Sequence, residues 1–195
     1  MLTTPAVQWL FSASFAVLAG YTGFRAADRR VGGGERAGQL WHVVMCLVMA
    51  AMVWRWWQVW PWVPQLILFI AASVWFAGVA LARTNGVISD QRWGHHPIWH
   101  DIVHLIMMLA MVWMIAIMRP SGDDHDHSGH ALAPASVLSG VALVAAMVVA
   151  ALVELVDLVV ATRARRSRGP TLLDPLAMIV MLAGMSAMSW IMLVP

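Results

Sequence analysis

Three segments of this chain carry histidine and methionine side chains at one repeated spacing. The sets are His42, Met45, Met49 and Met52; His104, Met107, Met111 and Met114; and Met178, Met181, Met185 and Met188. In each set the offsets from the first residue are 0, +3, +7 and +10. At about 3.6 residues per turn, such positions stack along one face of a helix. Each set therefore predicts a helix with a stripe of sulfur ligands, and an imidazole heads two of the three stripes.

The ligand types in these stripes favour a soft metal ion. Thioether sulfur and neutral imidazole suit Cu(I), whereas carboxylate oxygens suit Mg²⁺ and Ca²⁺. Because neutral sulfur does not cancel the charge of the ion, a ladder of such sites suits transfer more than storage. The structural alternative is that methionine, an adaptable apolar side chain, only fills gaps between packed helices. We keep both interpretations of the stripes, and the metal interpretation predicts copper, as Cu(I).

More histidines precede the second stripe. His96, His100 and His104 recur every four residues, so they share a helix face that runs into the stripe. We therefore add His100 to the predicted metal ligands.

Two acidic side chains are predicted to lie at the same level as these histidines, namely Glu154 and Asp174. Ionisable groups inside a membrane are costly and usually face the interior of the bundle. We expect both to be acidic partners of the site, with His42 or His104 as the partner of Glu154.

Residues 119–132 form a second candidate site, which we predict to be an exposed loop rich in His and Asp. Its predicted metal ligands are His125, His127 and His130. Short His-rich tracts are typical of metal binding. The alternative is a solvated acidic loop that happens to contain histidines.

Long apolar helices must position these residues. The chain is 61% hydrophobic and 11% charged, whereas a soluble domain carries about 25% charged residues. A membrane-spanning helix needs roughly 20 apolar residues. The apolar runs cover about 5–24, 38–55, 62–82, 98–118, 133–161 and 171–194. We therefore predict an all-α fold, a single membrane domain over 1–195 that is a bundle of six transmembrane helices.

The arginines predict how the helices are oriented. Ten of the twelve lie in the first, third and fifth loops, and positive residues favour the cytoplasmic side. We thus expect the plasma membrane of a bacterium, with both termini outside. The three striped helices then run in the same direction, as the second members of three helical-hairpin repeats.

One of the striped segments also resembles a known family. The run from His95-His96-Pro97-Ile98-Trp99-His100 through Met114, which includes Ala110-Met111-Val112-Trp113-Met114, is similar to an uncharacterised bacterial family of small multi-pass membrane proteins with a domain of unknown function. The resemblance covers most of the chain. It implies a membrane-embedded helical fold and implies no activity.

Three functions follow from these residues. The first is a membrane protein that binds or transfers copper. The second is a b-type haem protein, with His42 and His104, or one histidine and a methionine, as axial ligands. The third is a non-catalytic assembly partner of a membrane complex. The expected partners are the lipid bilayer, a metal ion, and another membrane protein or a second copy of the chain.

Two classes of function are not expected. The basic residues interrupt long apolar runs, which argues against nucleic acid as a partner. The chain has no Walker loop, no G-x-S-x-G element and no H-E-x-x-H helix. We therefore expect no enzyme and assign no catalytic residue.

Overall fold

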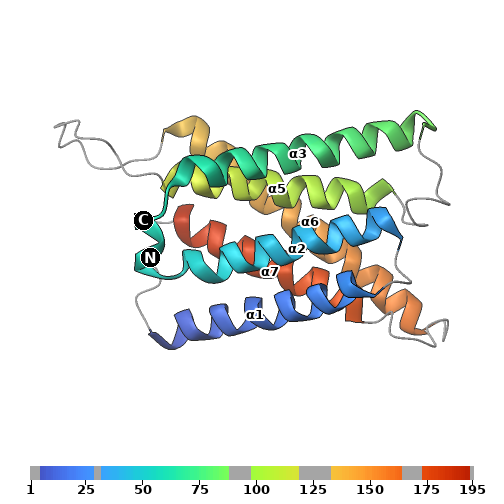
Figure 1. Cartoon of the computed structure of the whole chain (residues 1–195), viewed down its shortest axis with the longest axis horizontal. Coiled ribbons are helices and arrows are strands. Elements are labelled where there is room, and N and C mark those ends of the chain that lie inside the picture. The colour runs from blue at the N-terminus through green and yellow to red at the C-terminus, as the bar shows by residue number, and fades with distance from the viewer. Residues whose placement is uncertain (1–4, 29–31, 88–97, 119–132, 164–172, 194–195) are drawn as a thin grey trace.

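The computed structural model describes residues 5–28, 32–87, 98–118, 133–163 and 173–193, and their regular structure is entirely helical. Besides a short 3-10 helix, η1 (Arg55–Val59), six long helices form one bundle (Figure 1). They are α1 (Pro5–Ala27), α2 (Gly33–Met52), α3 (Trp62–Thr84), α5 (Ile98–Met118), α6 (Pro134–Arg163) and α7 (Leu173–Leu193). The prediction of an all-α bundle with six helices is confirmed for the described part of the chain.

Four of these helices, α3, α5, α6 and α7, are long and apolar enough to cross a membrane, with mean hydropathy between 2.0 and 2.6. Helices α1 and α2 contain 23 and 20 residues, are less apolar, and lie alongside the others (Figure 1). The architecture is consistent with the expected membrane protein.

The helices pair as three hairpins. The closest packing is between α1 and α2, between α3 and α5, and between α6 and α7. The hairpins join mainly through α5, which also packs on α6 and α7, while α1 contacts α7. Figure 1 shows that α2, α5 and α7 all begin at the same end of the bundle. The three striped helices are therefore the second members of their hairpins and run in the same direction.

Helix α2 differs from its expected range of 38–55. It begins at Gly33, because Glu35 in its first turn places a negative charge at the positive end of the helix. It ends at Met52, where the backbone becomes extended at Trp54 before η1. The site histidine of this helix therefore lies well inside it and not near its first turn.

Two glycines permit close packing in the interior. A Cβ added at Gly140 in α6 would lie 2.2 Å from the ring of Trp113 in α5, whose Nε1 donates to the carbonyl of Ser136 at 3.0 Å. A Cβ added at Gly184 in α7 would lie 2.8 Å from Phe15 of α1. These contacts bring α6 against α5, and α7 against α1.

Candidate metal site

All three methionine stripes face the interior of the bundle. Their ten methionines are at most 7% exposed and belong to one continuous core. Met108 and Met147, which the repeated spacing did not single out, are also fully buried there. The interior is therefore rich in sulfur along much of its length, and α6 contributes to it through Met147.

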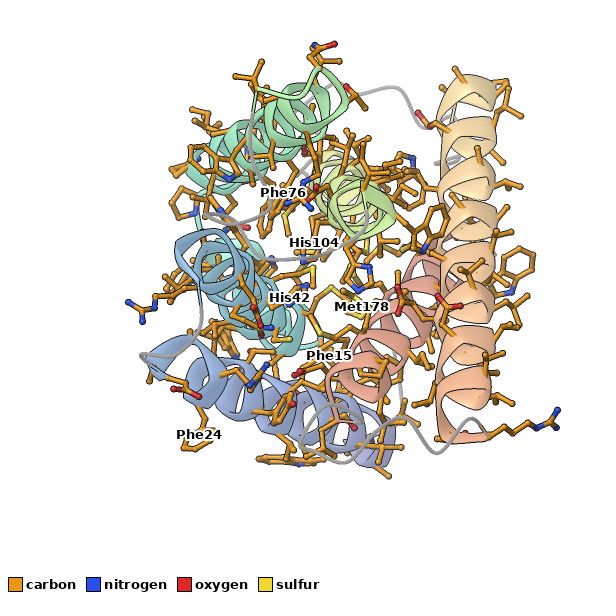
Figure 2. All side chains as sticks on the ribbon, turned by 90° about the vertical axis from the view of Figure 1, so that its right-hand side faces the viewer. Phe15, Phe24, His42, Phe76, His104 and Met178 are labelled. Carbon is orange, nitrogen blue, oxygen red and sulfur yellow. The ribbon has the colours of Figure 1, made fainter. Side chains whose placement is uncertain are left out.

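At one end of this interior, the histidines that head two stripes are in direct contact. The rings of His42 and His104 stack with centroids 4.5 Å apart and an interplanar angle of 18°. Phe76 of α3 also stacks on His104, at 5.0 Å and 22°. Figure 2 shows these three side chains converging from α2, α3 and α5. The sequence placed the two histidines at similar depth, and the fold makes them neighbours.

A cavity of about 140 Å³ lies beside this stack and is lined by residues of α1, α2, α3, α5 and α7. Among them are His42, His100, His104, Met178 and Met181. Figure 2 shows Met178 directed toward the same region as the two stacked histidines. The first residues of all three stripes thus share one cavity. The remaining stripe methionines are not part of its lining and lie in the packed core.

His42 lines this cavity and carries an unusual buried nitrogen. Its side chain is 5% exposed, and its Nε2 atom has no hydrogen-bond partner among the described residues. Leaving a buried polar atom unsatisfied costs about 1–3 kcal/mol. The unpartnered nitrogen makes His42 a candidate metal ligand.

His104 has a defined tautomer. Its Nδ1 atom contacts the backbone carbonyl of His100, and because a carbonyl only accepts, Nδ1 must donate. In the neutral ring Nε2 then carries the lone pair. That nitrogen faces α2, since a Cβ added at Gly38 would lie 3.7 Å from it. Nε2 of His104 is therefore directed toward the helix that carries His42.

Ion pairs surround the cavity. Arg83 of α3 lies 3.1 Å from Asp101 of α5. Arg25 of α1 binds Asp174 of α7 at 2.9 Å and Glu35 of α2 at 3.3 Å. These pairs tie together the ends of five helices, where the striped helices begin.

A further carboxylate approaches from α6. Glu154 lies beside His100, with Oε1 3.8 Å from Nδ1, rather than beside His42 or His104 as the sequence suggested. The reason is that α6 packs on α5, and His100 is one turn closer to the start of α5. With Glu154 included, four carboxylates and two guanidiniums surround the cavity. With neutral histidines, the net charge is negative and favours a cation.

The described residues contain no group of three or more His, Cys, Asp or Glu side chains that could hold a metal ion. The further donors that the lining offers are the methionine sulfurs of Met178 and Met181. The predicted outer-loop ligands His125, His127 and His130 lie outside the described residues, as do the rest of 119–132 and His96.

The sequence did not reveal several residues that shape the site: Tyr21, Arg25, Gln39, Phe76 and Arg83. Gln39 had a usable signal, since it lies three residues before His42 on the same helix face. Phe76 had none, because it is one of many apolar residues on α3.

The architecture defines a class, a membrane-type helical bundle with a cavity lined by histidine and methionine. More particularly, the chain belongs to the family described as domain of unknown function DUF5134, whose model matches residues 34–192. The resemblance to an uncharacterised family is thereby confirmed, and it carries no activity with it.

The curated relatives are similarly described. The chain is 27% identical over 114 residues to uncharacterized protein Rv0970 of Mycobacterium tuberculosis (strain ATCC 25618 / H37Rv) and to uncharacterized protein Mb0995 of Mycobacterium bovis (strain ATCC BAA-935 / AF2122/97). The alignments cover 58% of this chain and 50% of each relative. The chain thus spans about half the length of the curated relatives it matches. No solved structure matches it.

Proposed function

We propose that this chain is an integral membrane protein that binds Cu(I) in the cavity and passes it along the methionine stripes. One observation carries the proposal. His42, whose buried Nε2 has no hydrogen-bond partner among the described residues, lines a cavity together with His104, Met178 and Met181.

Ligand chemistry supports copper over harder cations. Imidazole nitrogen and thioether sulfur are the donors that can meet at the cavity, and this combination suits Cu(I). The ligands are neutral, so the surrounding excess of carboxylates supplies the compensating negative charge. Zinc sites of the structural kind use four cysteines or histidines, and Cys46, the one cysteine of the chain, is buried in the core.

The stacked histidines imply that binding involves a rearrangement. Because the two rings lie in nearly parallel planes, their lone pairs cannot converge on one ion. A shared ion therefore requires one ring to turn out of the stack into the cavity. The stacking energy lost in that step lowers affinity, which suits a site that must release its ion.

Geometry favours copper over the haem alternative. An iron held by two axial histidines lies between their nitrogens, so the two rings must be separated by the porphyrin. His42 and His104 instead contact each other at 4.5 Å between centroids, and a cavity of about 140 Å³ is far smaller than a porphyrin.

We also propose an orientation. Four arginines of the described residues belong to helix ends on the side where α2, α5 and α7 begin, namely Arg25, Arg36, Arg83 and Arg163 (Figure 1). Arg55, in η1, lies at the opposite end. Positive residues favour the cytoplasm. The cavity then lies toward the cytoplasmic face of a bacterial plasma membrane, and both termini lie outside.

The test is anaerobic titration of the purified protein in detergent with Cu(I), in competition with a colorimetric chelator. We expect stoichiometric binding by the wild type. Replacing both His42 and His104 by Leu should weaken it by at least about 100-fold, because loss of even an outer-shell partner of a metal ligand costs 10- to 100-fold.

The matched control replaces two other buried core residues that do not line the cavity, Met108 and Met147, by Leu. This variant should bind as the wild type does. Equal Cu(I) affinity of the histidine variant and the wild type would refute the proposal.

A further inference from the structure

Glu154 is the one buried carboxylate among the described residues. It is 2% exposed, although it lies on α6, whose apolar side chains are largely exposed on the outside of the bundle. Asp157, three residues further along the same helix, is exposed. An ionisable group in apolar surroundings is costly and usually marks a functional position. The burial of Glu154 therefore indicates that this carboxylate has a function.

His100 connects Glu154 to the cavity. The carboxylate oxygen Oε1 lies 3.8 Å from Nδ1 of His100, and His100 lines the cavity together with His104. This separation is longer than a hydrogen bond, so the two groups are adjacent but not bonded. A hydrogen bond between them requires one side chain to rotate toward the other.

The neighbouring His104 shows what such a bond achieves. The carbonyl of His100 accepts a hydrogen bond from Nδ1–H of His104, which leaves the lone pair of the neutral ring on Nε2. Metal-binding histidines almost always donate their second ring nitrogen in this way to a carbonyl or a carboxylate. Glu154 is placed to do for His100 what a backbone carbonyl does for His104.

We propose that Glu154 is a positioning residue for His100. Its carboxylate accepts a hydrogen bond from Nδ1–H of His100 and thereby presents Nε2 of that ring to a cation in the cavity. This inference rests on the proposed function, and it identifies Glu154 as the residue that orients His100 at the edge of the site.

The test combines two readouts on Glu154→Gln and Glu154→Leu. The first is ¹⁵N NMR of the metal-free protein labelled at histidine, with His100 assigned through His100→Gln. We expect one dominant His100 tautomer, protonated at Nδ1, in the wild type, a weaker preference in Glu154→Gln, whose amide can donate as well as accept, and a mixture in Glu154→Leu. The second is Cu(I) affinity, which should fall about 10-fold in Glu154→Gln and about 100-fold in Glu154→Leu.

Asp157→Asn is the matched control, because it removes an exposed carboxylate from the same helix; both readouts should stay as in the wild type. An unchanged His100 tautomer in the Glu154 variants would overturn the inference. Glu154→Met is of similar length and has no oxygen acceptor, so it decides the role of Glu154 if Glu154→Leu does not fold. If the wild type binds no Cu(I), the proposed function fails, while the tautomer in metal-free protein still tests whether Glu154 orients His100.

Discussion

The sulfur-rich interior has two regions that use the same residue types in different ways. At the end where the striped helices begin, His42, His104, Met178 and Met181 line a cavity, with ion pairs around it. Further along, methionines at the same repeated spacing are 0–5% exposed in a packed core without a place in that lining. The repeated spacing therefore identifies which face of each helix points into the bundle. A cavity and nearby polar groups are needed in addition to identify which part of that face is a candidate binding site.

Helix α7 offers the sharpest way to test this difference, because it contributes one pair of methionines to each region. Met178 and Met181 line the cavity, whereas Met185 and Met188 have the same spacing in the packed core. Changing Met178 and Met181 to Leu should weaken Cu(I) binding by about 10- to 100-fold, the range seen when metal sites are perturbed. The measurement is Cu(I) titration against a chelator.

The control variant changes Met185 and Met188 to Leu and should keep the affinity of the wild type. Both variants should remain folded, because Met-to-Leu changes conserve volume and usually cost less than about 1.5 kcal/mol. If the two pairs lower affinity equally, the distinction between cavity and core is wrong and the ion binds along the whole stripe.

In the packed region, a change in side-chain volume should alter the stability of the protein and leave its Cu(I) affinity unchanged. In Gly140→Ala the new Cβ would meet the Trp113 ring, 2.2 Å away in the present arrangement, and overpacking costs about 1–3 kcal/mol. The free energy of unfolding in detergent should fall by that amount, with Cu(I) affinity unchanged.

Gly78→Ala in α3 is the control, since nothing lies within 4 Å of its added Cβ. It should be neutral, or stabilise the protein by up to about 1 kcal/mol through helix propensity. Equal stability of the two variants would show that α6 does not pack on Trp113 as described.

Much of the fold could be predicted from the sequence, because apolar runs of the right length dictate helices and the repeated spacing dictates one helix face. The buried stripes follow from this periodicity, whereas the contact between His42 and His104 depends on how α2 and α5 pack. Periodicity could not predict that Met178 lines the cavity and Met185 does not, because the position of the cavity depends on how the helices pack.

The site residues on helices without a stripe could not be predicted either, because their positions also depend on how the helices pack. Glu154 was expected beside His42 or His104, but the packing of α6 on α5 places it beside His100. Phe76 and Arg25 enter the site through contacts between distant segments of the chain. Periodicity describes one helix at a time and says nothing about such contacts.

The central claim is that a cation in the cavity is bound by both imidazole nitrogen and methionine sulfur. X-ray absorption at the copper edge of the Cu(I)-loaded protein tests it most directly. We predict a mixed nitrogen and sulfur shell that loses sulfur when Met178 and Met181 are changed to Leu, and keeps it when Met185 and Met188 are changed. A shell of sulfur alone, or one that is the same in both variants, would contradict the account.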